Sequence, residues 1–166
     1  MVNIIQSAGG VVYYIADDKE PRYLLIKRYA ISKKIERVAP KWKIESGESI
    51  EDAALREISE EAGIPINSMK LGAKLWVTEL RSDESHKWQL NKDTTYFLVE
   101  YTWDPDLVSI EDGGWFTGVY MRATISQVIN LIYYQDIREL FRKAYHLLQN
   151  RNHTNKVKKD FMQKLD

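Results

Sequence analysis

The chain has 166 residues with 24 basic and 24 acidic side chains, so its formal net charge at pH 7 is zero. Balanced charge argues against a general nucleic-acid or membrane-surface binder. The absence of cysteine excludes disulfides, a thiolate nucleophile and a cysteine-based zinc site, and it is consistent with a cytoplasmic location. We expect no signal peptide and no membrane span, because the start lacks a basic region and no apolar run is long enough to cross a bilayer.

The first third of the chain is predicted to form two strands and a basic loop. Residues 4–15 are rich in β-branched and aromatic side chains and favour a strand interrupted at Gly9-Gly10, and residues 23–27 favour a second strand. Residues 27–43 are predicted to be a loop. Its seven basic residues are Lys27, Arg28, Lys33, Lys34, Arg37, Lys41 and Lys43.

A helix is predicted from Ser49 to Ala62, a segment that contains neither proline nor glycine. Ser49 has the side chain of a good N-cap, and Asp52 stands at the position of an imperfect capping-box partner. Gly63 followed by Pro65 indicates the end of the helix, since glycine adopts the left-handed C-cap and proline cannot continue.

Three glutamates of this predicted helix share one face. Glu57, Glu60 and Glu61 stand at positions i, i+3 and i+4, and Arg56 lies one turn before Glu60 and can pair with it. Their mutual repulsion costs stability unless a cation neutralises it. Oxygen ligands without neighbouring Cys or His favour Mg²⁺ or Mn²⁺ over zinc. The alternative interpretation is a solvated acidic face without a ligand.

The rest of the chain alternates between strands and helices and gives a mixed α/β domain. We predict strands at residues 69–79, 94–103 and 115–116, and helices at residues 125–131 and 136–148. From residue 150 the chain becomes polar and basic. We therefore predict a single domain over residues 1–149 and a C-terminal tail over residues 150–166.

The segment from Glu48 to Ile64 resembles the Nudix box, G-x5-E-x7-R-E-U-x-E-E-x-G-U, where U is apolar. The resemblance implies a Nudix-type α/β/α sandwich with a mixed β-sheet. It also implies a hydrolase that cleaves a nucleoside diphosphate linked to another moiety and uses a divalent metal. The implied metal ligands are Glu57, Glu60, Glu61 and the backbone carbonyl of Lys41.

The same resemblance implies roles for the other residues of the box. Arg56 would orient Glu60 or its neighbours, Glu48 would support the loop and the start of the helix, and Gly63 would end the helix. One position departs from the pattern, because Trp42 stands where the box has its first glycine. Glycine there permits positive φ or close backbone approach, so we expect Trp42 to divert the loop or to place an aromatic plate beside the substrate.

Short matches outside the box point to one branch of the family. Pro40-Lys41 and the segments 7–13 and 92–99 resemble dinucleoside polyphosphate and diphosphoinositol polyphosphate hydrolases. The implied substrate is a nucleotide, most specifically a dinucleoside polyphosphate such as diadenosine tetraphosphate, which is cleaved by attack of water on phosphorus. The candidate substrate-binding residues are Arg28, Lys41, Trp42, Lys43, Lys92 and Tyr96.

The general base and the substrate stay open at this point. Glu57 is one candidate base, and Glu111, in a loop outside the box, is another. One alternative is removal of pyrophosphate from an RNA 5′ end, which the basic loop and tail would serve, and another is cleavage of inositol pyrophosphates. A third is a non-catalytic Nudix nucleotide-binding module, which the replacement of glycine by Trp42 favours. The sequence does not indicate an oligomeric state.

Overall fold

A computed structural model describes residues 4–30, 33–81, 91–104 and 116–162. Its strands are β1 (Ile4–Ile15), β2 (Pro21–Tyr29), β3 (Ile35–Val38), β4 (Lys41–Lys43), β5 (Met69–Leu80), β6 (Asn91–Tyr101) and β7 (Phe116–Ala123). Its helices are α1 (Ile50–Ala62), α2 (Ile125–Leu131) and α3 (Gln135–Met162), with a short 3₁₀ turn at Ile66–Ser68. None of these helices is both long and apolar enough to span a membrane.

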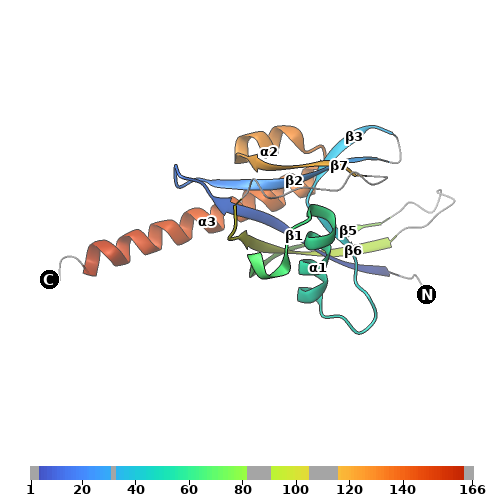
Figure 1. Cartoon of the computed structure of the whole chain (residues 1–166), viewed down its shortest axis with the longest axis horizontal. Coiled ribbons are helices and arrows are strands. Elements are labelled where there is room, and N and C mark those ends of the chain that lie inside the picture. The colour runs from blue at the N-terminus through green and yellow to red at the C-terminus, as the bar shows by residue number, and fades with distance from the viewer. Residues whose placement is uncertain (1–3, 31–32, 82–90, 105–115, 163–166) are drawn as a thin grey trace.

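The strands form one mixed sheet in the order β3-β2-β1-β6-β5, with β4 paired to β1 and β7 paired to β2. Strand β1 runs parallel to β6 and antiparallel to β2 and β4. Helix α1 covers one face of this sheet, and α2 and α3 lie on the other (Figure 1). The prediction of an α/β/α sandwich with a mixed sheet is therefore confirmed.

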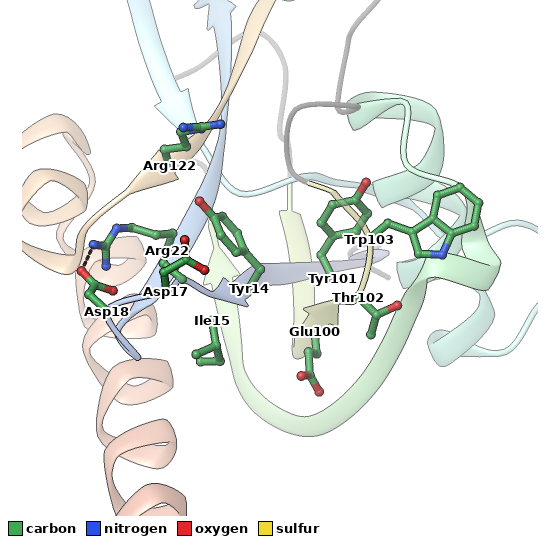
Figure 2. A pocket seen from close by; sticks show the side chains of 11 residues that line it. Tyr14, Ile15, Asp17, Asp18, Arg22, Glu100, Tyr101, Thr102, Trp103 and Arg122 are labelled. Atoms are coloured by element: carbon green, nitrogen blue, oxygen red, sulfur yellow. Dashed lines mark hydrogen bonds and ion pairs between the residues drawn. The ribbon is translucent and has the colours of Figure 1, made fainter.

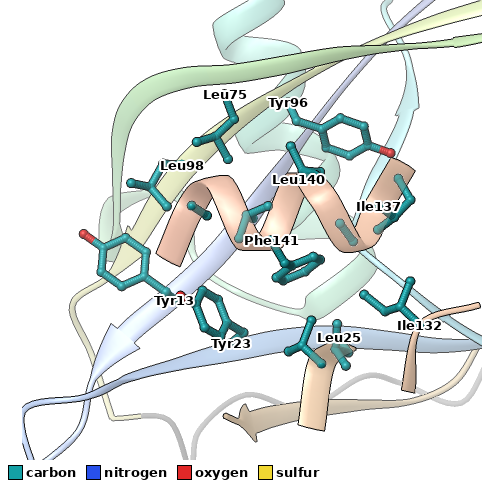
Figure 3. Close-up of a cluster of buried hydrophobic side chains, with 14 of the residues drawn as sticks. Tyr13, Tyr23, Leu25, Leu75, Tyr96, Leu98, Ile132, Ile137, Leu140 and Phe141 are labelled. Carbon is teal, nitrogen blue, oxygen red and sulfur yellow. The ribbon is translucent and has the colours of Figure 1, made fainter. Parts of the chain in front are cut away.

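Strand β1 is buried on both faces, and its side chains divide between two cores. Ala8 and Val12 pack in the cluster under α1, whereas Val11 and Tyr13 pack in the cluster under α3. This division follows from the alternation of side chains along a strand. In the second cluster the side chain of Phe141 points from α3 toward the sheet (Figure 3) and makes an edge-to-face contact with Tyr23, with ring centroids 5.5 Å apart.

The predicted loop at residues 27–43 was wrong over most of its length. Strand β2 continues to Tyr29, and β3 and β4 follow within the same segment. Strand β3 pairs with β2 from Ile26↔Val38 to Tyr29↔Ile35, and β4 pairs with β1 from Ser7↔Lys43 to Gly9↔Lys41. These are short strands with many basic side chains, so strand pairing rather than an alternating apolar pattern defines them.

The predicted interruption at Gly9-Gly10 was also wrong, because β1 is continuous. A Cβ at Gly9 would lie 2.2 Å from the Pro40 carbonyl oxygen and 2.6 Å from Lys41 Cβ. The Gly10 amide donates to the same Pro40 oxygen at 3.2 Å. Glycine therefore allows β1 to approach the Pro40–Lys41 backbone closely, and it does not break the strand.

Helix α3 continues to Met162, beyond the end at residue 148 that we predicted, and its C-terminal part projects past the sheet (Figure 1). The sequence from residue 150 to 162 has lost the apolar stripe but contains neither proline nor glycine, so nothing in it terminates a helix. The division into a domain of residues 1–149 and a tail of residues 150–166 stays a prediction.

We expect Gly9→Ala to lower the free energy of unfolding by about 1–3 kcal/mol, because the added methyl group must displace the Pro40–Lys41 backbone. Urea denaturation of the variant and the wild type measures this change. An unchanged denaturation midpoint would show that β1 and the Pro40–Lys41 segment are not packed this closely in solution.

Candidate active site

Helix α1 has the boundaries that its sequence predicts. The Ser49 hydroxyl accepts from the Asp52 amide at 3.0 Å and donates to the Asp52 carboxylate at 2.7 Å. Gly63 adopts φ 64° and ψ 25° at the C-cap. The apolar stripe of the helix is fully buried against the sheet, and it comprises Ala53, Ala54, Ile58 and Ala62. This packing fixes the rotation of α1 about its axis and hence the direction in which its glutamates point.

The three glutamates of the predicted metal site have unequal environments. Glu57 and Glu61 are buried, with 2% and 7% of their surface exposed, whereas the side chain of Glu60 is 61% exposed. One carboxylate oxygen of Glu61 accepts from the backbone amide of Lys41 at 2.9 Å. Glu57 and Glu61 are one turn apart beside the buried stripe, and Glu60 lies on the solvent side of them.

Arg56 connects these glutamates to the loop before the helix. Its guanidinium donates to both carboxylate oxygens of Glu48, at 2.8 and 2.9 Å, and to the Lys43 carbonyl at 3.3 Å. It also donates to the carboxylates of Glu57 and Glu60, the latter at 3.2 Å. Glu48 further accepts from the amide of Glu45 at 3.1 Å. Arg56 is therefore a shared counter-charge for three carboxylates and a brace for the loop.

Burial changes the acidity of the carboxylates. It raises the pKa of Glu61 to about 7, against the opposing effects of the Lys41 amide and ammonium groups. Burial also raises the pKa of Glu57, although Arg56 acts in the other direction. The Arg56 guanidinium holds the pKa of Glu48 below its usual range. The two buried glutamates are therefore the ones whose ionised forms most need a nearby positive charge.

A cluster of basic side chains lies beside these carboxylates. Burial, together with the positive charges of Lys92 and Arg28, lowers the pKa of Lys41 to about 8. Burial and Arg28 also lower the pKa of Lys92, while Glu61 and Glu57 oppose this change. Lys41, Lys92 and Arg28 therefore lie within electrostatic range of one another, and each lies within that range of Glu61. We call these three residues the basic cluster.

Arg28 is held in the cluster by two residues that the sequence analysis did not single out. Its Nε donates to Glu36 at 2.7 Å, and the hydroxyl of Tyr134 donates to the other oxygen of Glu36 at 2.9 Å. Glu36 is the only acidic residue between residues 27 and 43, which is a signal that could have identified it. Tyr134 lies between α2 and α3, and only the fold brings it to Glu36.

Trp42 does not divert the chain. It lies in β4, opposite Ala8 of β1, with its neighbours in regular strand pairing. It is 55% exposed, and the Lys92 ammonium is 5.1 Å from its ring centroid. Trp42 and Lys43 also line a cavity of about 320 Å³ together with Ile44, Glu45 and Ser46 of the loop before α1.

The remaining candidates for substrate binding are Tyr96 and Lys43, and they lie in different environments. Tyr96 is fully buried in the core cluster under α3, and its hydroxyl has no hydrogen-bond partner among the described residues. Its position is that of a core side chain and gives no surface for a substrate. Lys43 is exposed next to Trp42. Glu111, a candidate base, lies outside the described residues.

The donor chemistry fits a hard divalent cation only in part. Within the described ranges, no group of three acidic or histidine side chains is positioned to hold a metal ion. Glu57 and Glu61 supply buried carboxylate oxygens of the kind that Mg²⁺ and Mn²⁺ bind. Glu60 is turned toward Arg56. Glu57 and Glu61, with Glu60 one turn of the helix from Glu57, are the residues that would hold such a cation, and Arg56 engages both Glu57 and Glu60 in this structure.

A larger cavity, of about 790 Å³, lies where β1 and β6 end (Figure 2). Tyr14, Trp103 and Arg122 line it, together with the ion pair of Arg22 and Asp18. None of the box residues lines this cavity. The box lies instead beside the other half of β1, where β4 pairs with Ser7–Gly9.

Known proteins share this arrangement of strands and helices. The family model for the NUDIX domain matches residues 7–119. No curated protein sequence is significantly similar to the chain. Among solved structures, the chain is similar to a Caenorhabditis elegans Ap4A hydrolase in a binary complex, at 20% identity and TM-score 0.72, with 89% of this chain and 99% of that one covered.

Two other solved structures share the fold. The NUDIX domain of Shewanella oneidensis NrtR, complexed with ADP ribose, matches at 15% identity and TM-score 0.68, covering 89% of this chain and 90% of that one. The Nudix hydrolase RenU of M. smegmatis matches at 17% identity and TM-score 0.65, covering 93% and 89%. At these identities the likeness supports the fold and not a particular substrate.

The raised pKa of Glu61 predicts a pH-dependent stability in the absence of divalent metal. The folded chain retains a proton on Glu61 up to about pH 7, whereas the unfolded chain releases it near the ordinary value of 4.5. The contribution of Glu61 to the free energy of unfolding is thus highest at low pH and falls as the pH rises through this window. The charged groups that act on the pKa of Glu61 are those of Lys41, Arg28 and Glu57.

Denaturation in EDTA at about pH 5 and about pH 7.5 tests this prediction. We expect the wild type to lose more stability across the interval than Glu61→Gln, which keeps an acceptor for the Lys41 amide but does not titrate. Parallel pH profiles for the two proteins would contradict the assignment. Mg²⁺ should stabilise the wild type more at the higher pH, because it binds the ionised carboxylate.

Arg56→Lys should lower the free energy of unfolding by about 1–3 kcal/mol, since lysine cannot form the two-pronged contact with Glu48 and reach Glu57 as well. The matched control is Arg81→Lys, whose guanidinium is 42% exposed and pairs with Glu79 and Asp93. We expect a change below about 0.5 kcal/mol there. Equal losses in the two variants would show that Arg56 has no special structural role.

Proposed function

Because the chain belongs to the Nudix family, we propose that it is a divalent-metal-dependent pyrophosphohydrolase that cleaves a nucleoside polyphosphate. The most specific form of this proposal is a dinucleoside polyphosphate such as diadenosine tetraphosphate, cleaved by attack of water on phosphorus. One observation carries it: the buried carboxylate of Glu61 accepts from the Lys41 amide at 2.9 Å and lies within electrostatic range of the Lys41, Lys92 and Arg28 side chains. A polyphosphate with its bound metal needs both kinds of charge at one place.

The proposed metal ligands are the carboxylates of Glu57, Glu60 and Glu61 and the backbone carbonyl of Lys41. Mg²⁺ or Mn²⁺, when bound, would neutralise charge on the phosphates and lower the pKa of a coordinated water. Arg56 holds the carboxylates of Glu57 and Glu60 close to this position and keeps the preceding loop against the helix. Glu48 and Gly63 act structurally, since one anchors Arg56 and the other ends α1.

The basic cluster would bind and orient the phosphate chain. The ammonium groups of Lys41 and Lys92 and the guanidinium of Arg28 offer several donors to phosphate oxygens, and their burial strengthens each contact. Arg28 is orientated in advance by Glu36. Lys43 is exposed at the edge of the site and could contact a more distant phosphate.

Glu57 is our candidate for the general base among the described residues. Its burial raises the pKa above the usual range of a glutamate, which makes the carboxylate a better proton acceptor. In the absence of substrate its carboxylate is engaged by Arg56. Glu111 remains the second candidate.

A non-catalytic nucleotide-binding module is the second candidate function. The observation that favours it is the environment of Glu60, whose side chain is largely exposed and which, like Glu57, is engaged by Arg56. The NrtR domain with ADP ribose is an example of a nucleotide-derived ligand on this fold. Trp42 itself does not favour this alternative, because β4 accommodates it with ordinary strand pairing.

We expect the wild type to convert diadenosine tetraphosphate into ATP and AMP in the presence of Mg²⁺, as measured by chromatography of the products. Glu60→Gln should reduce the rate by roughly 100-fold or more, because it removes a charge placed for the transition state. The matched control is Glu51→Gln, an exposed glutamate in the first turn of the same helix. It should keep near-normal activity.

The opposite results separate the alternatives. Turnover that survives Glu60→Gln would contradict the proposed metal site. Binding of the nucleotide without turnover by the wild type would favour the non-catalytic module. Turnover of a triphosphorylated RNA end, without turnover of diadenosine tetraphosphate, would move the substrate to RNA.

A further inference from the structure

We propose that Trp42 and Lys92 form a nucleotide clamp, in which a substrate base stacks on the indole and the adjoining phosphate contacts the ammonium group. The proposal deepens the proposed function and rests on it. It makes an aromatic base, rather than the phosphate chain alone, part of what this site selects. Base-free polyphosphates and inositol pyrophosphates would lack half of the contact.

The clamp rests first on the position of the indole. Trp42 replaces a glycine of the box pattern, and its backbone lies in β4 opposite Ala8 without any conformation that only glycine favours. The loop therefore keeps its path, and the substitution adds a large side chain at its edge. That side chain is 55% exposed. Exposed indoles provide rigid, flat contact area and are enriched at binding sites.

The clamp also rests on the contact between Trp42 and Lys92. The ammonium group lies 5.1 Å from the ring centroid, within the range of a cation–π interaction. The same ammonium belongs to the basic cluster and lies within electrostatic range of Glu61 and Glu57. A phosphate bound to Lys92 is therefore within the span of one nucleotide from the indole. Of the other proposed phosphate ligands, Lys41 contacts Glu61 of α1 through its backbone amide, and Arg28 is held by Glu36.

The space beside the indole ring also supports the clamp. Trp42 borders a cavity of about 320 Å³ whose other walls are Lys43, Ile44, Glu45 and Ser46. This loop segment is braced by the contact between Arg56 and the Lys43 carbonyl. A base stacked on Trp42 would thus lie against a fixed wall. The chain has a second exposed indole for comparison, because Trp76 on β5 is 54% exposed and contacts Lys143 of α3 at 4.7 Å.

Calorimetric binding in a Glu60→Gln background tests the clamp without requiring turnover. The two probes are adenosine 5′-tetraphosphate and inorganic tripolyphosphate, both with Mg²⁺. Trp42→Ala should weaken binding of adenosine tetraphosphate by roughly 5- to 150-fold, the effect expected when an aromatic plate beneath a base is removed. Trp42→Phe should stay within roughly 3-fold of the parent, because it preserves a ring for stacking.

Binding of tripolyphosphate should change by less than roughly 3-fold in both variants. The matched control, Trp76→Ala, should leave both affinities unchanged. Equal losses for the two ligands in Trp42→Ala would overturn the clamp and show that the indole only supports Lys92 or the loop. No loss for adenosine tetraphosphate, a selective loss in Trp76→Ala instead, or no binding of adenosine tetraphosphate by the parent would also overturn it.

This result is separable from the test of the proposed function. A selective loss of adenosine tetraphosphate binding in Trp42→Ala, combined with no hydrolysis by the wild type, would support the clamp and refute the hydrolase. Hydrolysis of diadenosine tetraphosphate at the wild-type rate by Trp42→Ala, with unchanged KM, would support the hydrolase and refute the clamp.

Discussion

The guanidinium of Arg56 is the interaction on which the candidate site depends. Helix α1 carries three glutamates within five residues, and two of them are buried. Without a neighbouring positive charge this arrangement would be unfavourable, because burial and like-charge repulsion both act against ionised carboxylates. Arg56 contacts Glu48, Glu57 and Glu60 and also the Lys43 carbonyl. It therefore stabilises the acidic face and holds the end of β4, next to Trp42, beside it.

The second constraint is the close approach of β1 to the segment that enters the site. Gly9 leaves room for the Pro40 carbonyl, and β4 then pairs with β1 and presents the Lys41 amide to Glu61. The backbone thus brings the buried carboxylate of Glu61 to the partly buried Lys41. The other basic residues of the cluster, Arg28 and Lys92, lie on β2 and β6. The site is therefore assembled from elements that are distant in sequence. Acidic and basic side chains gather in one region because the sheet order places β2, β4 and β6 beside β1.

Trp42 stands at a position where the Nudix box has glycine. A tryptophan at a glycine position suggests a distorted loop when only the pattern is considered. The pairing of β4 with β1 removes that expectation, since the residue occupies ordinary strand geometry. What remains is a large exposed side chain beside Lys92, and such a side chain changes what the site can hold more than how the chain folds.

The sequence by itself determined helix α1, from the serine N-cap to the Gly63 C-cap, because caps and breakers act through local geometry. It also determined which residues carry the acidic and basic groups of the candidate site, and it predicted the layered α/β architecture. It could not show that Glu57 and Glu61 are buried while Glu60 is exposed, since helical spacing gives a shared face but not its orientation toward the sheet.

Only the tertiary structure decided the features that depend on strand pairing and long-range packing. Strands β3 and β4 exist because β2 and β1 offer partners, and their own sequences carry no clear alternation. Tyr96 is a core residue because α3 covers its face of the sheet, and Glu36 meets Tyr134 across 98 positions of sequence. Local patterns encode elements and their chemistry, whereas burial and contact follow from how distant elements pack, and that packing sets which of the candidate side chains can reach a ligand.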